Sequence, residues 1–172
     1  MTPKPPAGIL RSHPAWLIAT WFGAGLVPKI PGTLASLTAL PFAWIIQWLF
    51  GAPGLVAAGA TAFAAGLWAC GKLVPRGSSD DPGHIVIDEV AGQWLTLAPL
   101  AAVSPSPDPL FYVTGFALFR LFDIMKPWPV DWAERHFPGG LGIMADDVAA
   151  AAYAGAGVTF IYAYTHGLIS LS

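Results

Sequence analysis

Two pairs of adjacent carboxylates and one further acid are the residues of this chain best suited to chemistry. Asp88 and Glu89 stand near the start of one apolar stretch, and Asp146 and Asp147 stand at the start of another. Asp123 lies near the end of a third. Charged groups at such positions usually face one another or a wet cavity. Because oxygen-only ligands suit Mg²⁺ or Mn²⁺ better than zinc, these acids are predicted to share a divalent cation.

A sixth acid, Asp81, lies where the preceding loop approaches Asp88 and is a further candidate ligand. These acids outnumber the bases near them, since the close candidates are Lys29, Arg120 and Lys126. One alternative is a set of structural ion pairs that join helix ends. The second acid pair has a simpler alternative too, because acids at a helix start interact favourably with its dipole.

Residues 23–36, GAGLVPKIPGTLAS, contain the parts of a phosphate site. Pro31 and Gly32 signal a turn, after which Thr33 is expected to cap a helix, with Ser36 three residues on. The free N–H groups and positive dipole end of such a helix bind phosphate, and Lys29 adds a charge. The alternative is an ordinary capped membrane helix with a lysine reaching the headgroups.

The segment FRLFDIMKPWP places Arg120 and Asp123 three residues apart, on one helical face. Lys126 follows before a proline ends the helix. Arginine is suited to bidentate phosphate contact, although an intrahelical ion pair is the alternative. Trp128 and Trp132 are expected at the lipid headgroup level.

Cys70 and Arg76 have the C-x5-R spacing of cysteine phosphatases, in which a thiolate attacks phosphate. The loop between them is GKLVP, but the usual His before the cysteine and the usual Ser or Thr after the arginine are missing. Cys70 is expected in the last turns of a membrane helix, where burial would make it unreactive. A cysteine mechanism is therefore disfavoured.

The composition indicates a protein that lies in lipid. The 172 residues are 55% hydrophobic and only 10% charged, against roughly 25% charged in soluble domains. The net charge of −2 gives no indication of nucleic-acid binding. One cysteine and four scattered histidines argue against an internal disulfide and a Cys/His zinc site.

An all-α, polytopic membrane helix bundle is therefore expected, as a single domain over residues 1–172 with a flexible segment at 1–14. A short amphipathic helix over residues 15–22, anchored by Trp16 and Trp21, is favoured over a signal peptide. Joints rich in proline and glycine separate about five membrane helices, predicted over residues 34–50, 54–74, 85–103, 110–125 and 148–170.

Threading these helices through a bilayer puts every charged side chain except Asp108 on one side. All eight Lys and Arg residues lie there, so the positive-inside rule makes that side the cytoplasm.

Taken together, four motifs resemble the bacterial phosphatidylglycerophosphatases of the A type. They are GAGLVPKIPGTLAS, DPGHIVIDEVAGQW, FRLFDIMKPWP and PGGLGIMADDVAA, in the expected order over residues 23–150. The last motif departs slightly, because Ala follows Ala150 where the family pattern has Gly. The resemblance implies a multi-pass, Mg²⁺-dependent enzyme of the inner membrane. It would hydrolyse phosphatidylglycerophosphate to phosphatidylglycerol, the final step of phosphatidylglycerol synthesis.

On this hypothesis the phosphate is held by Lys29, Thr33, Ser36, Arg120 and Lys126. Four of the metal-binding acids are predicted to be catalytic, namely Asp88, Glu89, Asp123 and Asp147. Attack by water and attack by an aspartate both remain open. A cation transporter and a noncatalytic membrane scaffold are the rival functions, although a transporter should carry its acids near mid-membrane.

Overall fold

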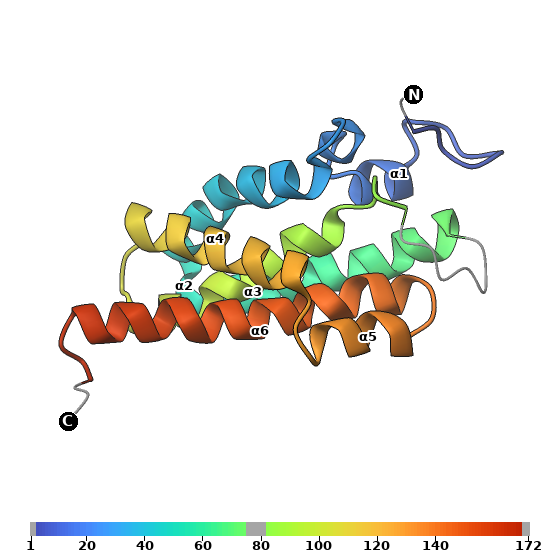
Figure 1. The fold of residues 1–172 in the computed structure, drawn as a ribbon. Helices are drawn as coiled ribbons and strands as arrows, with labels where there is room; N and C mark the ends of the chain where they lie inside the picture. Colours follow the sequence, from blue (N-terminus) through green and yellow to red (C-terminus); the bar gives the residue numbers. More distant parts are fainter. Residues whose placement is uncertain (1–2, 75–81, 170–172) are drawn as a thin grey trace.

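A computed structural model describes residues 3–74 and 82–169, and its regular elements are all helices. Most of them run along one long axis (Figure 1). The prediction of an all-α fold is confirmed. In chain order the elements are α1 (Pro14–Ala19), the 3₁₀ helix η1 (Ala24–Leu26), α2 (Pro31–Leu73), α3 (Ile87–Val103), α4 (Pro109–Met125), α5 (Val130–His136) and α6 (Gly140–Thr165).

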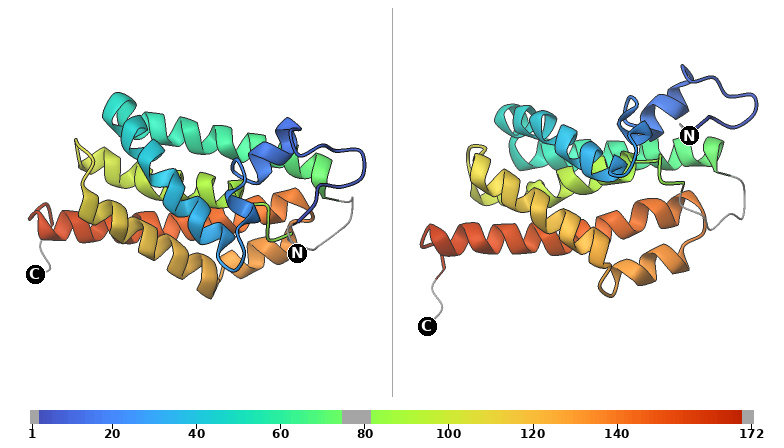
Figure 2. Two further views of the ribbon diagram at one scale, coloured as in Figure 1. Left: turned by 90° about the horizontal axis from the view of Figure 1, so that it is seen from above. Right: turned by 45° about the horizontal axis from the view of Figure 1, so that its top comes forward.

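The 43 residues of α2 form two arms that meet at Gly51. Gly51 has φ of 63° and ψ of −155°, a conformation that residues with a side chain rarely adopt. The second arm returns toward the end of the molecule where the first arm began (Figure 2). The turn predicted at residues 51–54 is therefore confirmed, and it brings the start and the end of α2 to the same end of the bundle.

α3 packs against both α2 and α6 and is the most buried of the long helices. Small residues let its neighbours approach closely. A β-carbon on Gly92 would lie 2.6 Å from the ring of Phe119 in α4, and one on Gly59 of α2 would lie 2.7 Å from Leu95. The first contact places the start of α3 beside the end of α4, where the acids lie, and the second holds α3 against α2.

A buried polar network closes the opposite end of the bundle. The hydroxyl of Tyr112 donates to Oε1 of Gln47 at 2.7 Å, and Nε2 of Gln47 donates to the carbonyl of Ser104 at 3.1 Å. The network joins α2, α4 and the loop after α3. Asp108 caps α4 at this end, where its carboxylate accepts from the N–H of Leu110.

Two helices, α2 and α6, are long and apolar enough to cross a membrane by length and composition. α3 and α4 have 17 residues each, or about 25 Å at 1.5 Å per residue, which is shorter than a hydrocarbon core of about 30 Å. Five complete crossings therefore remain a prediction. Large apolar side chains cover the bundle, and Trp48 and Phe50 are 73% and 66% exposed.

Two local expectations are wrong. Trp16 is no interfacial anchor, because its side chain is buried and packs against the ring of His84, with centroids 5.0 Å apart. α6 begins at Gly140 and ends at Thr165, rather than running from 148 to 170. Asp146 and Asp147 consequently lie well inside a helix, so helix capping does not explain them.

Candidate active site

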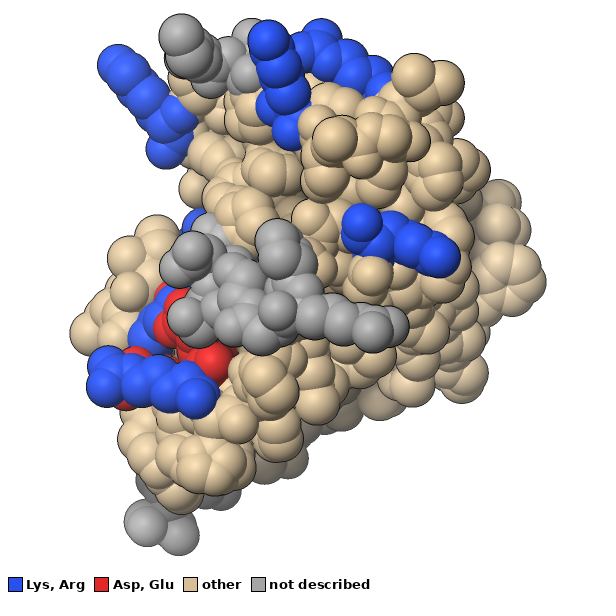
Figure 3. Space-filling model, turned by 90° about the vertical axis from the view of Figure 1, so that its right-hand side faces the viewer, with Lys and Arg blue, Asp and Glu red and all other residues tan. Residues whose placement is uncertain are grey.

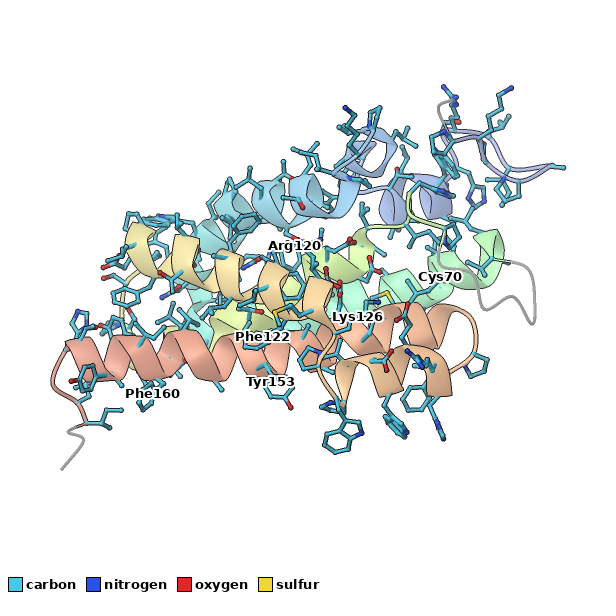
Figure 4. The ribbon with its side chains drawn as sticks, in the orientation of Figure 1. Cys70, Arg120, Phe122, Lys126, Tyr153 and Phe160 are labelled. Carbon is cyan, nitrogen blue, oxygen red and sulfur yellow. The ribbon has the colours of Figure 1, made fainter. Side chains whose placement is uncertain are left out.

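The acids singled out in the sequence meet at one end of the bundle. Asp88 and Glu89 stand in the first turn of α3, and Asp123 stands in the last turn of α4. Asp146 and Asp147 reach them from α6. Figure 4 shows carboxylate oxygens gathered beside Arg120 and Lys126. The convergence that the sequence predicted is present.

The five acids form two overlapping groups of three that could hold a metal ion. One group is Asp88, Glu89 and Asp147, and the other is Asp123, Asp146 and Asp147. Within each group the three candidate ligand atoms lie within 4.8 Å of one another. Figure 3 shows Asp and Glu side chains in a recess between Lys and Arg side chains.

Local backbone contacts orient the two acid pairs. The N–H of Glu89 donates to Oδ1 of Asp88 at 3.1 Å, and the N–H of Asp147 donates to Oδ1 of Asp146 at 2.9 Å. Successive residues of a helix point about 100° apart. The side chains of Asp146 and Asp147 therefore point to different neighbours. Asp146 accepts a hydrogen bond from Lys126, and Asp147 is grouped with the acids of α3.

Arg120 supplies a guanidinium group to the site. Its Nη1 atom lies 2.8 Å from Oδ2 of Asp123 and 3.9 Å from Oε1 of Glu89. The intrahelical pair, which was the alternative to phosphate contact, is thus present, and Arg120 also reaches the acid on α3. Because these side chains are only about 15% exposed, the guanidinium is held in place between α3 and α4.

Lys126 is the second cation, directly after the last residue of α4. Its Nζ atom lies 2.8 Å from Oδ2 of Asp146 and 2.8 Å from Oε2 of Glu134 on α5. Burial alone would lower the pKa of Lys126, but the hydrogen bonds to these two acids outweigh burial and raise it. The ammonium therefore stays charged and ties α4, α5 and α6 together.

The donor set fits a hard divalent cation. Asp147 is 3% exposed, and its Oδ2 atom has no hydrogen-bond partner among the described residues. A buried carboxylate oxygen without a partner is costly, and a bound cation would remove that cost. All of the candidate ligands are carboxylate oxygens, as Mg²⁺ and Mn²⁺ prefer.

The first turn of α2 lies against this cluster. A β-carbon on Gly32 would overlap Oε1 of Glu89 and lie 3.3 Å from Nη1 of Arg120. The predicted cap at Thr33 is wrong, because the helix begins at Pro31, and no side chain of the described residues caps it. Its first N–H groups lie next to the acids without a side-chain cap from the described part of the chain.

The remaining predicted residues lie in varied places. Ser36 is buried, and its hydroxyl donates to the carbonyl of Gly32, which favours a structural role. Lys29 is exposed, has φ of 76°, and lines a hollow of about 550 Å³ next to Pro31. Asp81 lies outside the described residues.

Sequence reasoning missed two residues of the site, Glu134 and Gly32. Glu134 lies on the short helix α5 and reaches Lys126 only because α4 and α5 fold together. Gly32 was expected merely to make a turn. Cys70 is buried against Gly140, where α6 begins, in keeping with packing rather than nucleophilic attack.

Comparison with known proteins identifies the family. The model of the family Phosphatidylglycerophosphatase A matches residues 17–162. The phosphatidylglycerophosphatase A of Escherichia coli (strain K12) is 39% identical over 140 residues, which cover 81% of this chain and 78% of the relative. That of Haemophilus influenzae is 37% identical over 142 residues, covering 83% and 85%. A Bacteroides thetaiotaomicron protein, provisionally named a phosphatidylinositol-3-phosphatase, is 42% identical over 143 residues, which cover 80% of this chain and 86% of the relative.

No solved structure matches the chain. The chain belongs to the phosphatidylglycerophosphatase A family.

Proposed function

We propose that this phosphatase removes the terminal phosphate of phosphatidylglycerophosphate, on the cytoplasmic face of the bacterial inner membrane. The products are phosphatidylglycerol and inorganic phosphate. One observation carries the site proposal: five carboxylates from three helices gather beside two cations at one end of an apolar bundle. A lipid phosphomonoester presents its headgroup at the membrane surface, where such an end would lie.

The metal in this proposal is Mg²⁺, with Mn²⁺ as a substitute. The residues that would hold it are the two overlapping acid groups, and the unpartnered Oδ2 atom of Asp147 supports this assignment. When bound, the cation neutralises the charge that develops on the phosphate oxygens as the P–O bond breaks.

Phosphate binding is assigned to the cations and to the start of α2. Arg120 stands between α3 and α4, where its remaining N–H groups can donate to phosphate oxygens. The first N–H groups of α2 lie beside it and favour an anion. Lys126 holds Asp146 on the far side of the cluster, and Lys29 and Thr33 stand near the start of α2, where a headgroup would enter.

Hydrolysis forms a bond from a water oxygen to phosphorus and breaks the bond to the glycerol oxygen, which takes up a proton. In one route a carboxylate accepts the proton of the attacking water. In the other route an aspartate attacks phosphorus, and water then hydrolyses the acyl phosphate. An aspartyl adduct trapped with BeF₃⁻ would support the second route. The carboxylates proposed for these roles are Asp88, Glu89, Asp123 and Asp147.

The cytoplasmic orientation rests on charge. The acid cluster and its cations lie at one end of the long helices, and Asp108 lies at the other. Cytoplasmic loops carry an excess of Lys and Arg, so the charged end is assigned to the cytoplasm. The thiols introduced by Asp108→Cys and by Arg135→Cys should react with an impermeant thiol reagent from opposite sides of sealed vesicles.

A second substrate is suggested by the Bacteroides relative, whose provisional name specifies a phosphoinositide. Phosphatidylinositol 3-phosphate is also a lipid phosphomonoester, so the same acids and cations could act on it. The two candidates differ in the group that carries the phosphate, which is a flexible glycerol in one and a cyclic inositol in the other.

Release of inorganic phosphate from the purified chain tests the proposal. Activity on phosphatidylglycerophosphate that is abolished by EDTA and restored by Mg²⁺ is expected, with slower release from phosphatidylinositol 3-phosphate. Asp88→Asn should reduce the rate by about 10²-fold or more, while Cys70→Ser should keep full activity. Wild-type turnover by Asp88→Asn would overturn the metal assignment, and absence of phosphate release would favour a transporter or a scaffold.

A further inference from the structure

We infer that the site binds two divalent cations and that Asp147 is the ligand they share. This inference rests on the proposed function only in assuming that the acids bind a divalent metal. The inference adds two things to the proposed function: the number of ions, and the residue that binds both of them. The other acids would each bind one ion only.

The geometry of the acids points to two ions. Each group of three offers ligand atoms within 4.8 Å of one another, and among the described residues Asp147 is the one member that both groups share. Asp88 and Glu89 complete the first group from α3, while Asp123 and Asp146 complete the second from α4 and α6. Paired catalytic cations generally lie about 3.5–4 Å apart, a distance that one carboxylate can bridge.

The side chain of Asp147 supplies an independent observation. It is almost fully buried, yet its Oδ2 atom has no hydrogen-bond partner among the described residues. The helix that carries it is held close to α3, because a β-carbon on Gly92 would lie 3.1 Å from the carbonyl oxygen of Asp147. A buried carboxylate oxygen of this kind is costly unless a proton or a bound cation neutralises it, and the place of Asp147 in both acid groups favours a cation.

Binding of Mn²⁺ to the full chain, purified in detergent and freed of metal, tests the inference without an activity readout. Equilibrium dialysis should give two Mn²⁺ per chain at saturation. The electron paramagnetic resonance spectrum of that sample should show spin coupling between the ions. One Mn²⁺ per chain, or two ions with uncoupled signals, would overturn the inference.

Variants assign the ligands. Glu89→Gln and Asp123→Asn should each retain one Mn²⁺ with an uncoupled signal, while Asp147→Asn should lose the coupling altogether. The matched control is Asp131→Asn, since that exposed acid of α5 pairs with Arg135, belongs to neither acid group and should keep two coupled ions. If Asp147→Asn retains two coupled ions, the shared ligand is another residue and the inference fails.

Circular dichroism establishes which variants fold. If Asp147→Asn does not fold, the inference is tested by the Glu89 and Asp123 variants, and either of them retaining two coupled ions would overturn it. The outcomes also separate this inference from the proposed function. An active enzyme with one ion per chain would overturn the inference alone. A chain with two coupled ions that releases no phosphate from either lipid would overturn the proposed function alone.

Discussion

The backbone of Gly32 lies directly against the carboxylate of Glu89. A β-carbon at residue 32 would overlap Oε1 of Glu89 and come within 3.3 Å of Nη1 of Arg120. The contact joins the start of α2 to the start of α3 and the end of α4. A helix N-terminus and an acid cluster therefore meet at a place with no room for a side chain.

Gly32→Ala should impair both catalysis and folding. The added methyl group must displace Glu89 or the first turn of α2, and a misplacement of about 1 Å in a catalytic group can reduce the rate about 10²-fold. The cost in stability should be about 1–3 kcal/mol, as for an overpacked site. Phosphate release and the thermal unfolding midpoint in detergent measure the two effects.

Gly71→Ala is the matched control, because Gly71 is also in α2 but a β-carbon there would meet nothing within 4 Å. That change should leave activity intact and stabilise the helix by up to about 1 kcal/mol. Equal activity of the two alanine variants would show that the contact between Gly32 and Glu89 has no part in catalysis.

Lys126→Met should destabilise the protein. It removes the ammonium from between Asp146 and Glu134 and leaves two partly buried carboxylates facing each other. Because the lysine side chain is 29% exposed, we expect a loss of about 1–3 kcal/mol rather than the roughly 3–5 kcal/mol of a fully buried pair. Chemical unfolding in detergent, without added metal, measures the loss.

Arg135→Met is the comparison for that variant, since it breaks the exposed pair with Asp131 on α5. Exposed pairs contribute little, so the change should stay within about 0.5 kcal/mol. A Lys126 variant as stable as the Arg135 variant would refute the role of Lys126 in tying α4, α5 and α6 together.

Tyr112→Phe should lower stability and leave catalysis unchanged. The variant loses the hydroxyl that donates to Gln47 at the end of the bundle remote from the acids. An unsatisfied buried acceptor costs about 1–3 kcal/mol. The KM and kcat of phosphate release should match those of the wild type below the unfolding temperature. A large fall in kcat would show that the two ends of the bundle are coupled.

His84 should make stability depend on pH. Burial lowers the pKa of His84, so below about pH 6.5 the unfolded chain takes up a proton that the folded chain does not. The stability associated with neutral His84 is therefore present above that pH and is lost as the pH falls. The denaturation midpoint should fall more for the wild type than for His84→Asn between about pH 7.5 and 5.5. Parallel curves for the two proteins would contradict this assignment.

Local signals in the sequence predicted much of this architecture. Long apolar runs indicated the helices, because hydropathy depends on nearby residues alone. The turn of α2 at Gly51 followed from a glycine and proline cluster. The prediction that acids from three segments meet came from their position at the ends of apolar runs, and in the structure Asp147 belongs both to a group with Asp88 and to a group with Asp123 and Asp146.

The tertiary structure decided which partner each side chain has. Hydropathy did not reveal that α6 begins at Gly140, because the residues before Asp146 look like a flexible loop. Trp16 is buried by contact with His84, although its sequence surroundings resemble those of an interfacial anchor. The contact of Gly32 with Glu89 and the reach of Glu134 to Lys126 depend on how helices cross. The sequence by itself therefore predicted most of the helices, the cluster of acids and the family motifs. Packing between distant segments decided which residues pair, since such contacts have no local signature.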